Sequence, residues 1–321
     1  MDDLPSIDEL RLSRELRSVG RDDRVLRRSA HRGELVQLSR GVYTPRATWD
    51  LRDAGLRYQL KSIGAVTGSR TAPILSHGSA AALLGIPRSG APPQKVHVLA
   101  TVASGSRTEG EFARHATEHL DFDIESLGQA RRTGLRRTLV EYCLVESFAN
   151  AVVALDWALA TPRDSARPRA DRASLLDCAD QLGINRGRTR LLRALAFADP
   201  ASESAGESFS RAVIHELGFP APELQFDFDD RMGHVGRVDF WWPEQQLIGE
   251  FDGVAKYVRE EFTQGVPIQQ IVIAEKRRED RLRALGPRVT RWDAATVSNS
   301  PLFYLRLSQA GLHSKRRRRF V

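Results

Sequence analysis

The stretch RVDFWWPEQQLIGEFDG, residues 237–253, limits what this chain can fold into more than any other segment. Two apolar runs flank the polar residues 243–246, and because proline interrupts a central strand, we expect a hairpin with its loop there. Carboxylates interrupt both runs, at Asp239, Glu250 and Asp252. Carboxylates are unfavourable in a strand that is simply buried. The register of the hairpin therefore determines which groups these acids can contact.

Pairing Trp242 with Leu247 fixes that register. It sets three further pairs opposite each other: Trp241 with Ile248, Phe240 with Gly249, and Asp239 with Glu250. Because side chains alternate along a strand, one face is predicted to carry Val238, Phe240, Trp242, Leu247, Gly249 and Phe251. The other face is predicted to carry Asp239, Trp241, Ile248, Glu250 and Asp252.

Like charges directly opposite each other on a sheet repel, so a positive group is expected beside the acids. A divalent cation, Mg²⁺ or Mn²⁺, is one candidate because it takes hard oxygen ligands. A basic side chain such as Arg237 or Lys256 is another. Acids that merely solvate an open face are the third interpretation, against which Trp241 and Ile248 on the same face argue.

A fourth acid precedes the hairpin. The segment ESFSRAVIHELG is expected to be a helix with Phe209, Val213 and Leu217 as its buried stripe, which places Glu207 in the first turn. The order helix Glu, strand Asp, hairpin, strand Glu and then Lys256 suits metal-dependent phosphodiester cleavage. In that chemistry carboxylates hold Mg²⁺, the metal activates water and a lysine assists.

Residues 204–297 resemble the restriction-endonuclease-like PD-(D/E)xK superfamily, in the uncharacterised branch similar to very-short-patch repair endonucleases. The resemblance lies in ESFSRAVIHELGFPAPELQ, RVDFWWP, GEFDGVAKY and EKRREDRLRALGPRVTRW. It implies a mixed sheet flanked by helices, with Asp239 and Glu250 as metal ligands and Asp252 as a further candidate ligand. Glu207 would be an accessory acid and Lys256 the catalytic cation.

Two departures from that family's pattern keep a second interpretation open. Asp252 stands where the family usually has a lysine, two residues after the strand Glu, and Tyr257 stands where relatives of this branch often have a histidine. A nuclease fold that is retained for DNA binding alone is therefore the alternative to a metal-dependent endonuclease.

Basic residues mark two candidate nucleic-acid surfaces. In IDELRLSRELRSVGRDDRVLRRSAHRGELVQLSRGVY, two helices and a two-stranded ribbon are expected, as in a winged helix-turn-helix whose second helix enters the DNA major groove. Arg24, Arg27 and Arg28 share one face of that helix. Near the C-terminus, Lys276, Arg277 and Arg281 are candidate phosphate contacts. A solvated, salt-bridged helix face is the alternative at both places.

The middle of the chain, with RGVYTP, ILSHGSAAALLGIP, KVHV and ALDWALA, resembles the AbiEi family of type IV antitoxins. This resemblance covers about the first half of the chain and implies DNA binding or autoregulation, with a partner toxin that the sequence does not identify. No GxSxG elbow surrounds Ser76 and His77, so we expect a helix-capping serine beside a packed histidine rather than a catalytic pair.

Composition sets the remaining expectations. The 321 residues include 48 Lys plus Arg for a net charge of +7, which favours polyanionic partners. DNA is the expected partner, and RNA is not excluded. The two cysteines, Cys143 and Cys178, have no metal-ligand spacing and are expected to be buried thiols. No signal or membrane segment is recognised, so we expect a cytoplasmic protein without a membrane partner.

The predicted fold class is α/β in a multi-domain α+β chain. The predicted domains are a winged helix-turn-helix (1–50), an AbiEi-like α+β region (51–160), a linker with helices (161–200), a nuclease-like domain (201–300) and a basic tail (301–321). The predicted function is DNA binding with Mg²⁺-dependent phosphodiester hydrolysis, in defence, repair or a toxin–antitoxin setting. A non-catalytic DNA-binding regulator or antitoxin is the alternative.

Overall fold

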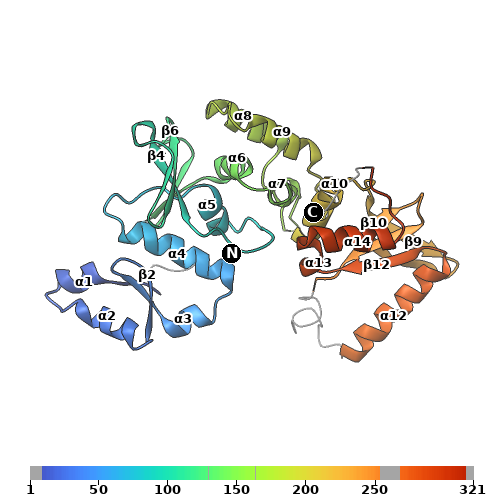
Figure 1. The fold of residues 1–321 in the computed structure, drawn as a ribbon, viewed down its shortest axis with the longest axis horizontal. Helices are drawn as coiled ribbons and strands as arrows, with labels where there is room; N and C mark the ends of the chain where they lie inside the picture. The colour runs from blue at the N-terminus through green and yellow to red at the C-terminus, as the bar shows by residue number, and fades with distance from the viewer. Residues whose placement is uncertain (1–8, 129, 163, 254–267, 316–321) are drawn as a thin grey trace. The chain divides into compact units, whose positions relative to one another are not determined.

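The computed structural model describes residues 9–128, 130–162, 164–253 and 268–315. It is a mixed α+β structure, as the helices and small sheets of Figure 1 show. The chain forms two compact units. Unit 1 comprises Met1–Ser147 and Ala170–Arg193, and unit 2 comprises Phe148–Arg169 and Ala194–Val321. Within the described residues, no helix combines the length and apolarity needed to cross a membrane.

Unit 1 begins with two short helices and a hairpin. The elements are β1 (Arg11–Leu12), α1 (Ser13–Ser18), α2 (Arg24–His31), β2 (Leu35–Ser39) and β3 (Val42–Pro45). The strands form a sheet in the order β1-β3-β2, with both pairs antiparallel. Gly41 makes the turn between β2 and β3 with a φ of 75°, a value that glycine adopts without strain. The predicted hairpin ELVQLS–RGVY is therefore confirmed.

The rest of unit 1 packs helices against a small sheet. Its helices are α3 (Arg46–Asp50), α4 (Ala54–Gly68), α5 (His77–Leu83), η2 (Val102–Ser104), α6 (Leu135–Val145), α8 (Arg172–Gln181) and the start of α9 (Arg188–Phe197). Its strands are β4 (Val96–Thr101), β5 (Arg107–Glu109), β6 (Phe112–Thr117), β7 (Ile124–Leu127) and β8 (Ala130–Thr133). The order is β4-β6-β5, with β4 and β6 parallel, and β7 pairs with β8.

Ser76 is the N-cap residue of α5, but its side chain makes no capping hydrogen bond. Its hydroxyl lies 3.0 Å from Nδ1 of His77 instead, and Glu141 lies 3.6 Å from the same nitrogen. In a Ser-His-Asp triad the serine and the acid use opposite nitrogens of the imidazole. The arrangement therefore differs from a triad, and the predicted capping bond is wrong.

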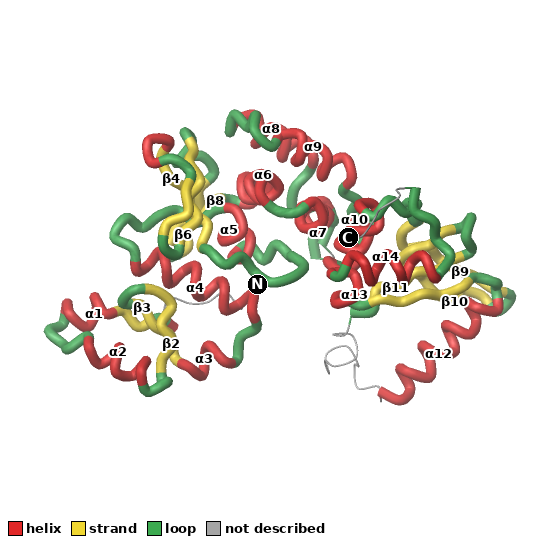
Figure 2. Tube along the Cα trace, in the orientation of Figure 1, coloured by secondary structure: helices red, strands yellow, loops and turns green. Residues whose placement is uncertain are grey.

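Unit 2 contains a four-stranded mixed sheet with helices around it, as Figure 2 shows by colour. Its strands are β9 (Glu223–Asp230), β10 (Gly233–Trp242), β11 (Leu247–Phe251) and β12 (Arg288–Trp292), in the order β12-β11-β10-β9. Only the β11–β12 pair is parallel in this sheet. The helices are α7 (Phe148–Leu159), α10 (Ala205–Glu216), α12 (Ile268–Ala284), α13 (Ala294–Ser298) and α14 (Ser300–Gln309).

The hairpin register matches the predicted one at three pairs: Phe240 with Gly249, Trp241 with Ile248, and Trp242 with Leu247. The predicted face of Val238 is wrong, because Val238 packs with Trp241 and Ile248 rather than with Phe240 and Trp242. The alternation breaks beside Asp239, since neither Asp239 nor Gln225 enters the β9–β10 register and Gln225 has a φ of 51°. Such a local irregularity re-aims side chains, as β-bulges do.

One side of the sheet packs on α10 and α14. Phe240, Trp242, Leu247 and Trp292 lie in one core with residues of both helices. Gly206 in α10 allows close contact with the sheet, because a Cβ there would lie 2.0 Å from the ring of Phe251. This contact positions the first turn of α10 beside the end of β11.

The predicted basic tail at 301–321 is wrong for residues 301–315. Asn299 caps α14, and Phe303, Leu307 and Leu312 are fully buried in the core of unit 2. Phe303 and Leu307 are four residues apart and therefore share one side of the helix, and Leu312 follows the helix end. Residues 316–321 lie outside the described residues.

The boundaries of the two units differ from those of the domains predicted from the sequence. Residues 148–160, expected in the AbiEi-like region, form α7 and pack against α10 in unit 2, whereas α8 from the expected linker packs on α6 in unit 1. Cys143 and Cys178 are buried free thiols, as predicted. Burial raises the pKa of Cys143 to about 12 and that of Cys178 to about 11.

Candidate functional site

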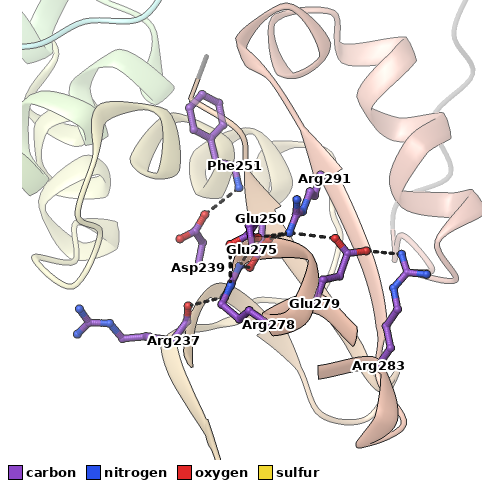
Figure 3. Close-up of polar contacts among 9 residues, drawn as sticks. All are labelled: Arg237, Asp239, Glu250, Phe251, Glu275, Arg278, Glu279, Arg283 and Arg291. Atoms are coloured by element: carbon purple, nitrogen blue, oxygen red, sulfur yellow. Dashed lines mark hydrogen bonds and ion pairs between the residues drawn. The ribbon is translucent and has the colours of Figure 1, made fainter. Parts of the chain in front are cut away.

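Three of the predicted site acids lie in one pocket of unit 2. Asp239, Glu250 and Asp252 line a cavity of about 260 Å³ at the end of β11, beside the middle of β10. The other lining residues are mainly charged and come from β10, β11, α12 and β12: Arg237, Phe251, Glu275, Arg278 and Arg291. Figure 3 shows the side chains of Glu250, Glu275, Arg278 and Arg291 pointing toward one another and the guanidinium of Arg237 pointing away. The cavity therefore combines four carboxylates with three guanidinium groups.

Glu250 is held by two arginines. Its Oε1 accepts a hydrogen bond from Arg278 Nη2 at 2.5 Å, and its Oε2 lies 2.9 Å from Arg291 Nη2. Arg291 reaches it because the parallel register of β11 and β12 places the two residues side by side. Arg278 comes from α12 (Figure 3). The side chain of Glu250 is only 11% exposed, so these contacts are shielded from bulk water.

The same arginines contact two further glutamates of α12. Arg278 donates to Glu275 at 3.0 Å, and Arg291 lies 2.5 Å from Glu275 and 3.2 Å from Glu279. Burial alone would raise the pKa of Glu275, but Arg278 and Arg291 hold it below its ordinary value. Burial likewise opposes the charge of Arg278, and Glu275 and Glu250 raise the pKa of Arg278 above its ordinary value.

Asp239 and Asp252 complete the acidic side of the pocket. The Oδ2 atom of Asp239 accepts a hydrogen bond from the backbone N–H of Phe251 at 2.8 Å. The backbone N–H of Asp252 donates to the carbonyl of Trp292 at 2.8 Å, which continues the β11–β12 pairing by one residue. Both aspartates therefore lie where β11 ends against its neighbours.

The described side chains do not fit a preformed metal site. Both oxygens of Glu250 are engaged by arginines, and Asp239 has one oxygen on a backbone N–H. Within the described ranges, no three His, Cys, Asp or Glu side chains are arranged to hold an ion. The compensating positive charge that the sequence requires is present as Arg278 and Arg291.

Glu207, a predicted catalytic residue, is not among the residues that line this pocket. Glu207 accepts hydrogen bonds from the hydroxyl of Ser204 at 2.7 Å, the backbone N–H of Glu203 at 2.9 Å and Gln225 Nε2 at 2.8 Å. Ser204 is the N-cap residue of α10, and its hydroxyl accepts from the backbone N–H of Glu207 at 3.2 Å, while the bond from Gln225 ties Glu207 to β9. Lys256 lies outside the described residues.

The candidate phosphate contacts of α12 divide into two kinds. Lys276 and Arg277 are exposed. Arg281 forms a two-bond ion pair with Asp230, at 2.7 and 2.8 Å, and also donates to the carbonyl of Gly233. Arg281 therefore anchors α12 to the β9–β10 turn, which leaves Lys276 and Arg277 as the accessible cations of the predicted set.

The predicted arginines of α2 also differ among themselves. Arg24, Arg27 and Arg28 are all exposed. Arg28 pairs with Asp22 at 3.3 Å, whereas the side chains of Arg24 and Arg27 have no carboxylate partner among the residues that the structure describes. Arg24 and Arg27 are thus the arginines of this helix whose charge is uncompensated.

Sequence reasoning missed the roles of Arg278 and Arg291 at Glu250. One signal was present, since RVTRW follows a helix and reads as a strand, and pairing it in parallel with LIGEF puts Arg291 beside Glu250. No comparable signal exists for Arg278, because the direction of α12 across the sheet depends on its tertiary contacts.

Comparison with known proteins leaves the activity open. No protein-family model matches the chain. The chain is similar to the uncharacterized proteins MT2308 and Rv2248 of two strains of Mycobacterium tuberculosis, CDC 1551 and H37Rv. Each is 29% identical over 222 residues, which span 69% of this chain and 75% of the relative.

Proposed function

We propose that this protein binds double-stranded DNA through unit 1 and that unit 2 is a nuclease-like fold that does not cut it. On this proposal the protein acts as a DNA-binding regulator or antitoxin. Glu250 then belongs to a structural ion-pair network with Arg278, Arg291 and Glu275, and Asp239 and Asp252 lie beside it. A cofactor metal is not needed to keep these acids together.

The arrangement of α1, α2 and the β2–β3 hairpin supports DNA binding. A winged helix-turn-helix has two helices followed by such a ribbon, and its second helix enters the major groove. In this chain that helix presents Arg24 and Arg27 to solvent without carboxylate partners among the described residues. Uncompensated arginines on such a helix suit contacts to phosphates or to guanine edges.

The double ion pair on Glu250 is the observation that favours binding over cleavage. A divalent ion at Glu250 would have to displace Arg278 and Arg291, which are also held by Glu275. Removing a partner from a shielded ion pair costs about 3 to 5 kcal/mol. The aspartate that replaces the usual lysine, Asp252, adds negative charge where the resemblance to the nuclease superfamily expects a cation.

Metal-dependent cleavage of DNA is the second candidate. It is favoured by one observation, that Asp239, Glu250 and Asp252 line the same cavity as three arginines. The mixed sheet, with Glu207 on the preceding helix and the acids on β10 and β11, also agrees with the resemblance to PD-(D/E)xK nucleases.

The proposal is tested by measuring the affinity of the full chain for a labelled duplex of about 25 base pairs by fluorescence anisotropy. We expect saturable binding that is equal in Mg²⁺ and in EDTA, with the DNA recovered intact. The double variant Arg24→Ala/Arg27→Ala should bind about tenfold more weakly or worse. Each phosphate contact that is lost means that fewer counterions are released when the protein binds DNA, and this release favours binding. The matched control Arg32→Ala/Arg46→Ala removes two arginines that pair with Glu34 and Asp50.

The control should bind within about twofold of the unmodified chain, since paired arginines release fewer counterions on binding. Absence of duplex binding by the unmodified chain would overturn the proposal. An equal loss in the two double variants would show that only total charge matters and would remove α2 as the contact.

A further inference from the structure

We infer that a groove of unit 1, which borders α2 and shares Arg27 with it, holds the sugar–phosphate backbone of DNA. The groove lies between α1, the β2–β3 turn and the end of α4 and has a volume of about 790 Å³. Its arginines come from each of these elements and from α2: Arg14, Arg17, Arg27, Arg40 and Arg70. The inference rests on the proposed binding of DNA and names where its backbone lies.

The groove carries many more positive than negative side chains. Among the described residues, five arginines line it and Asp23 is its one acid. Asp23 pairs with Arg17 at 3.4 Å. Arg27, Arg40 and Arg70 are exposed and have no carboxylate partner in the described part of the chain. Other exposed arginines of unit 1 do have acidic partners, as Arg32 has Glu34 at 2.7 Å.

Three hydrogen bonds hold the walls of the groove in place. The backbone N–H of Ser13 donates to the carbonyl of Gly41 at 2.9 Å, which ties α1 to the turn. Arg14 donates to the carbonyl of Thr67 at 3.1 Å, and the hydroxyl of Ser39 donates to the carbonyl of Gly64 at 3.0 Å. The last two bonds tie α1 and β2 to α4, so the three walls form a single preorganised surface.

Close packing brings Arg70 to this surface. A Cβ at Gly68 would lie 2.7 Å from the hydroxyl oxygen of Ser39 and 2.9 Å from a methyl group of Val42. Only glycine lets the end of α4 approach the turn so closely, and Arg70 follows two residues later. Residues beyond the expected 1–50 domain therefore contribute to the basic groove.

A polyanionic backbone is the occupant that this chemistry suits. Arginines that converge from several elements neutralise several phosphates at once, and each neutralised phosphate releases condensed counterions. Guanidinium groups also match the geometry of phosphate oxygens. The side chains in the groove lie next to α2, so one duplex could contact α2 with its bases and the groove with its backbone.

The test compares Arg40→Ala/Arg70→Ala with the control Arg32→Ala/Arg46→Ala in the full chain. Both double variants remove two exposed positive charges from unit 1, but only the first pair lines the groove. Affinity for the labelled duplex is measured by anisotropy in EDTA from about 50 to 300 mM NaCl. The melting temperatures of both variants must equal that of the unmodified chain, which removes misfolding as a cause.

We expect the groove variant to lose about tenfold or more in affinity at the lower salt concentrations. The slope of log affinity against log salt should become shallower by about 2, because about 0.9 ion is released for each phosphate contact. The control should keep both affinity and slope. A groove variant that binds like the control would overturn the inference while leaving DNA binding itself in place.

Two further outcomes separate the groove from the proposed function. No binding by the unmodified chain would overturn both. An unmodified chain that prefers a single-stranded or duplex RNA competitor over DNA of equal length would overturn DNA as the occupant. Metal-dependent cleavage together with groove-dependent binding would overturn the non-catalytic proposal and leave the groove supported.

Discussion

Glu250 lies where β11 runs beside β12, and its carboxylate is almost fully shielded from water. Burying a charge in such a place is costly unless a partner and hydrogen bonds compensate it. Arg278 and Arg291 supply both. At the scale of single residues, the negative charge of Glu250 is therefore neutralised by arginines of the same chain.

Replacing Glu250 with Gln should destabilise unit 2. Two partly buried guanidinium groups would lose a carboxylate, so we expect the free energy of unfolding to fall by about 1 to 3 kcal/mol. Tryptophan fluorescence during urea unfolding reports on this unit, because Trp157, Trp241, Trp242 and Trp292 belong to it. The exposed Glu244 provides the control Glu244→Gln, which should change stability by less than about 0.5 kcal/mol. Equal stability of the two variants would contradict the structural role of Glu250.

Histidines in unit 1 make its stability depend on pH. His97 Nδ1 and His115 Nε2 lie 2.9 Å apart, and the rings of His77 and His115 stack with centroids 3.6 Å apart. Burial is the main cause that lowers the pKa of all three, for His115 to about 4. His77 also faces Glu141 and the positive charge of Arg137. All three imidazoles are thus favoured in the neutral form.

The sign of the pH effect follows from these lowered pKa values. Between the unfolded pKa of about 6.5 and the folded pKa, the unfolded chain binds more protons, so unfolding becomes easier as the pH falls. The stabilisation is fully present above pH 6.5 and is lost toward pH 4, by about 3 kcal/mol for His115. Hydrogen exchange of β4 and β6 measured across this interval should show the loss. His115→Gln should flatten it, and an unchanged pH profile in that variant would contradict the account.

At the scale of elements, α7 and α10 are joined by a buried ion pair. Arg211 Nη2 donates to both oxygens of Asp156, at 3.0 and 2.8 Å, and its guanidinium lies over the ring of Phe197. The side chains are 8% and 1% exposed. Burial raises the pKa of Asp156, and Arg211 opposes that shift.

Removing one partner of this ion pair should lower the free energy of unfolding more than replacing both partners with apolar residues. Asp156→Ala leaves Arg211 buried without its carboxylate, so we expect unit 2 to lose about 3 to 5 kcal/mol in urea unfolding. The double variant Asp156→Leu/Arg211→Met removes both charges and should lose clearly less than the single variant. A double variant as unstable as Asp156→Ala would show that packing rather than charge sets the cost.

The elements of the hairpin were predictable because the rules that form them are local. Pro243 and the polar residues after it mark a loop, and the alternation on either side fixes the pairs from Phe240 to Leu247. The face of Val238 was not predictable, since the break beside it depends on Gln225 in a different strand. Residues 301–315 were wrongly predicted as a tail, although the four-residue spacing of Phe303 and Leu307 is typical of a helix with one buried side.

The candidate site was also predictable only in part, because some of its contacts join segments that are far apart in the sequence. The three acids could be assigned to one pocket from the register of neighbouring residues. Of their partners, Arg291 could have been found by pairing RVTRW in parallel with LIGEF. Arg278 could not, because it lies 28 positions after Glu250 and reaches it through the packing of α12. The helix acid Glu207 was placed in the correct turn, but its role in capping depends on Ser204 and Gln225.

At the scale of the whole molecule, the chain carries uncompensated arginines in unit 1 and a largely compensated carboxylate cluster in unit 2. Arg27, Arg40 and Arg70 have no acidic partner among the described residues, whereas Glu250 has two basic ones. This contrast leads to the proposal that unit 1 binds DNA and that unit 2 does not cut it.

The central claim is tested most directly by incubating the full chain with supercoiled and branched DNA in Mg²⁺, in Mn²⁺ and in EDTA, beside a Glu250→Ala variant. Gel electrophoresis resolves nicked and linear products. We predict that the DNA is bound but stays intact under all three conditions and with both proteins. Metal-dependent cleavage that is present in the unmodified chain and absent in Glu250→Ala would contradict the account and establish the endonuclease.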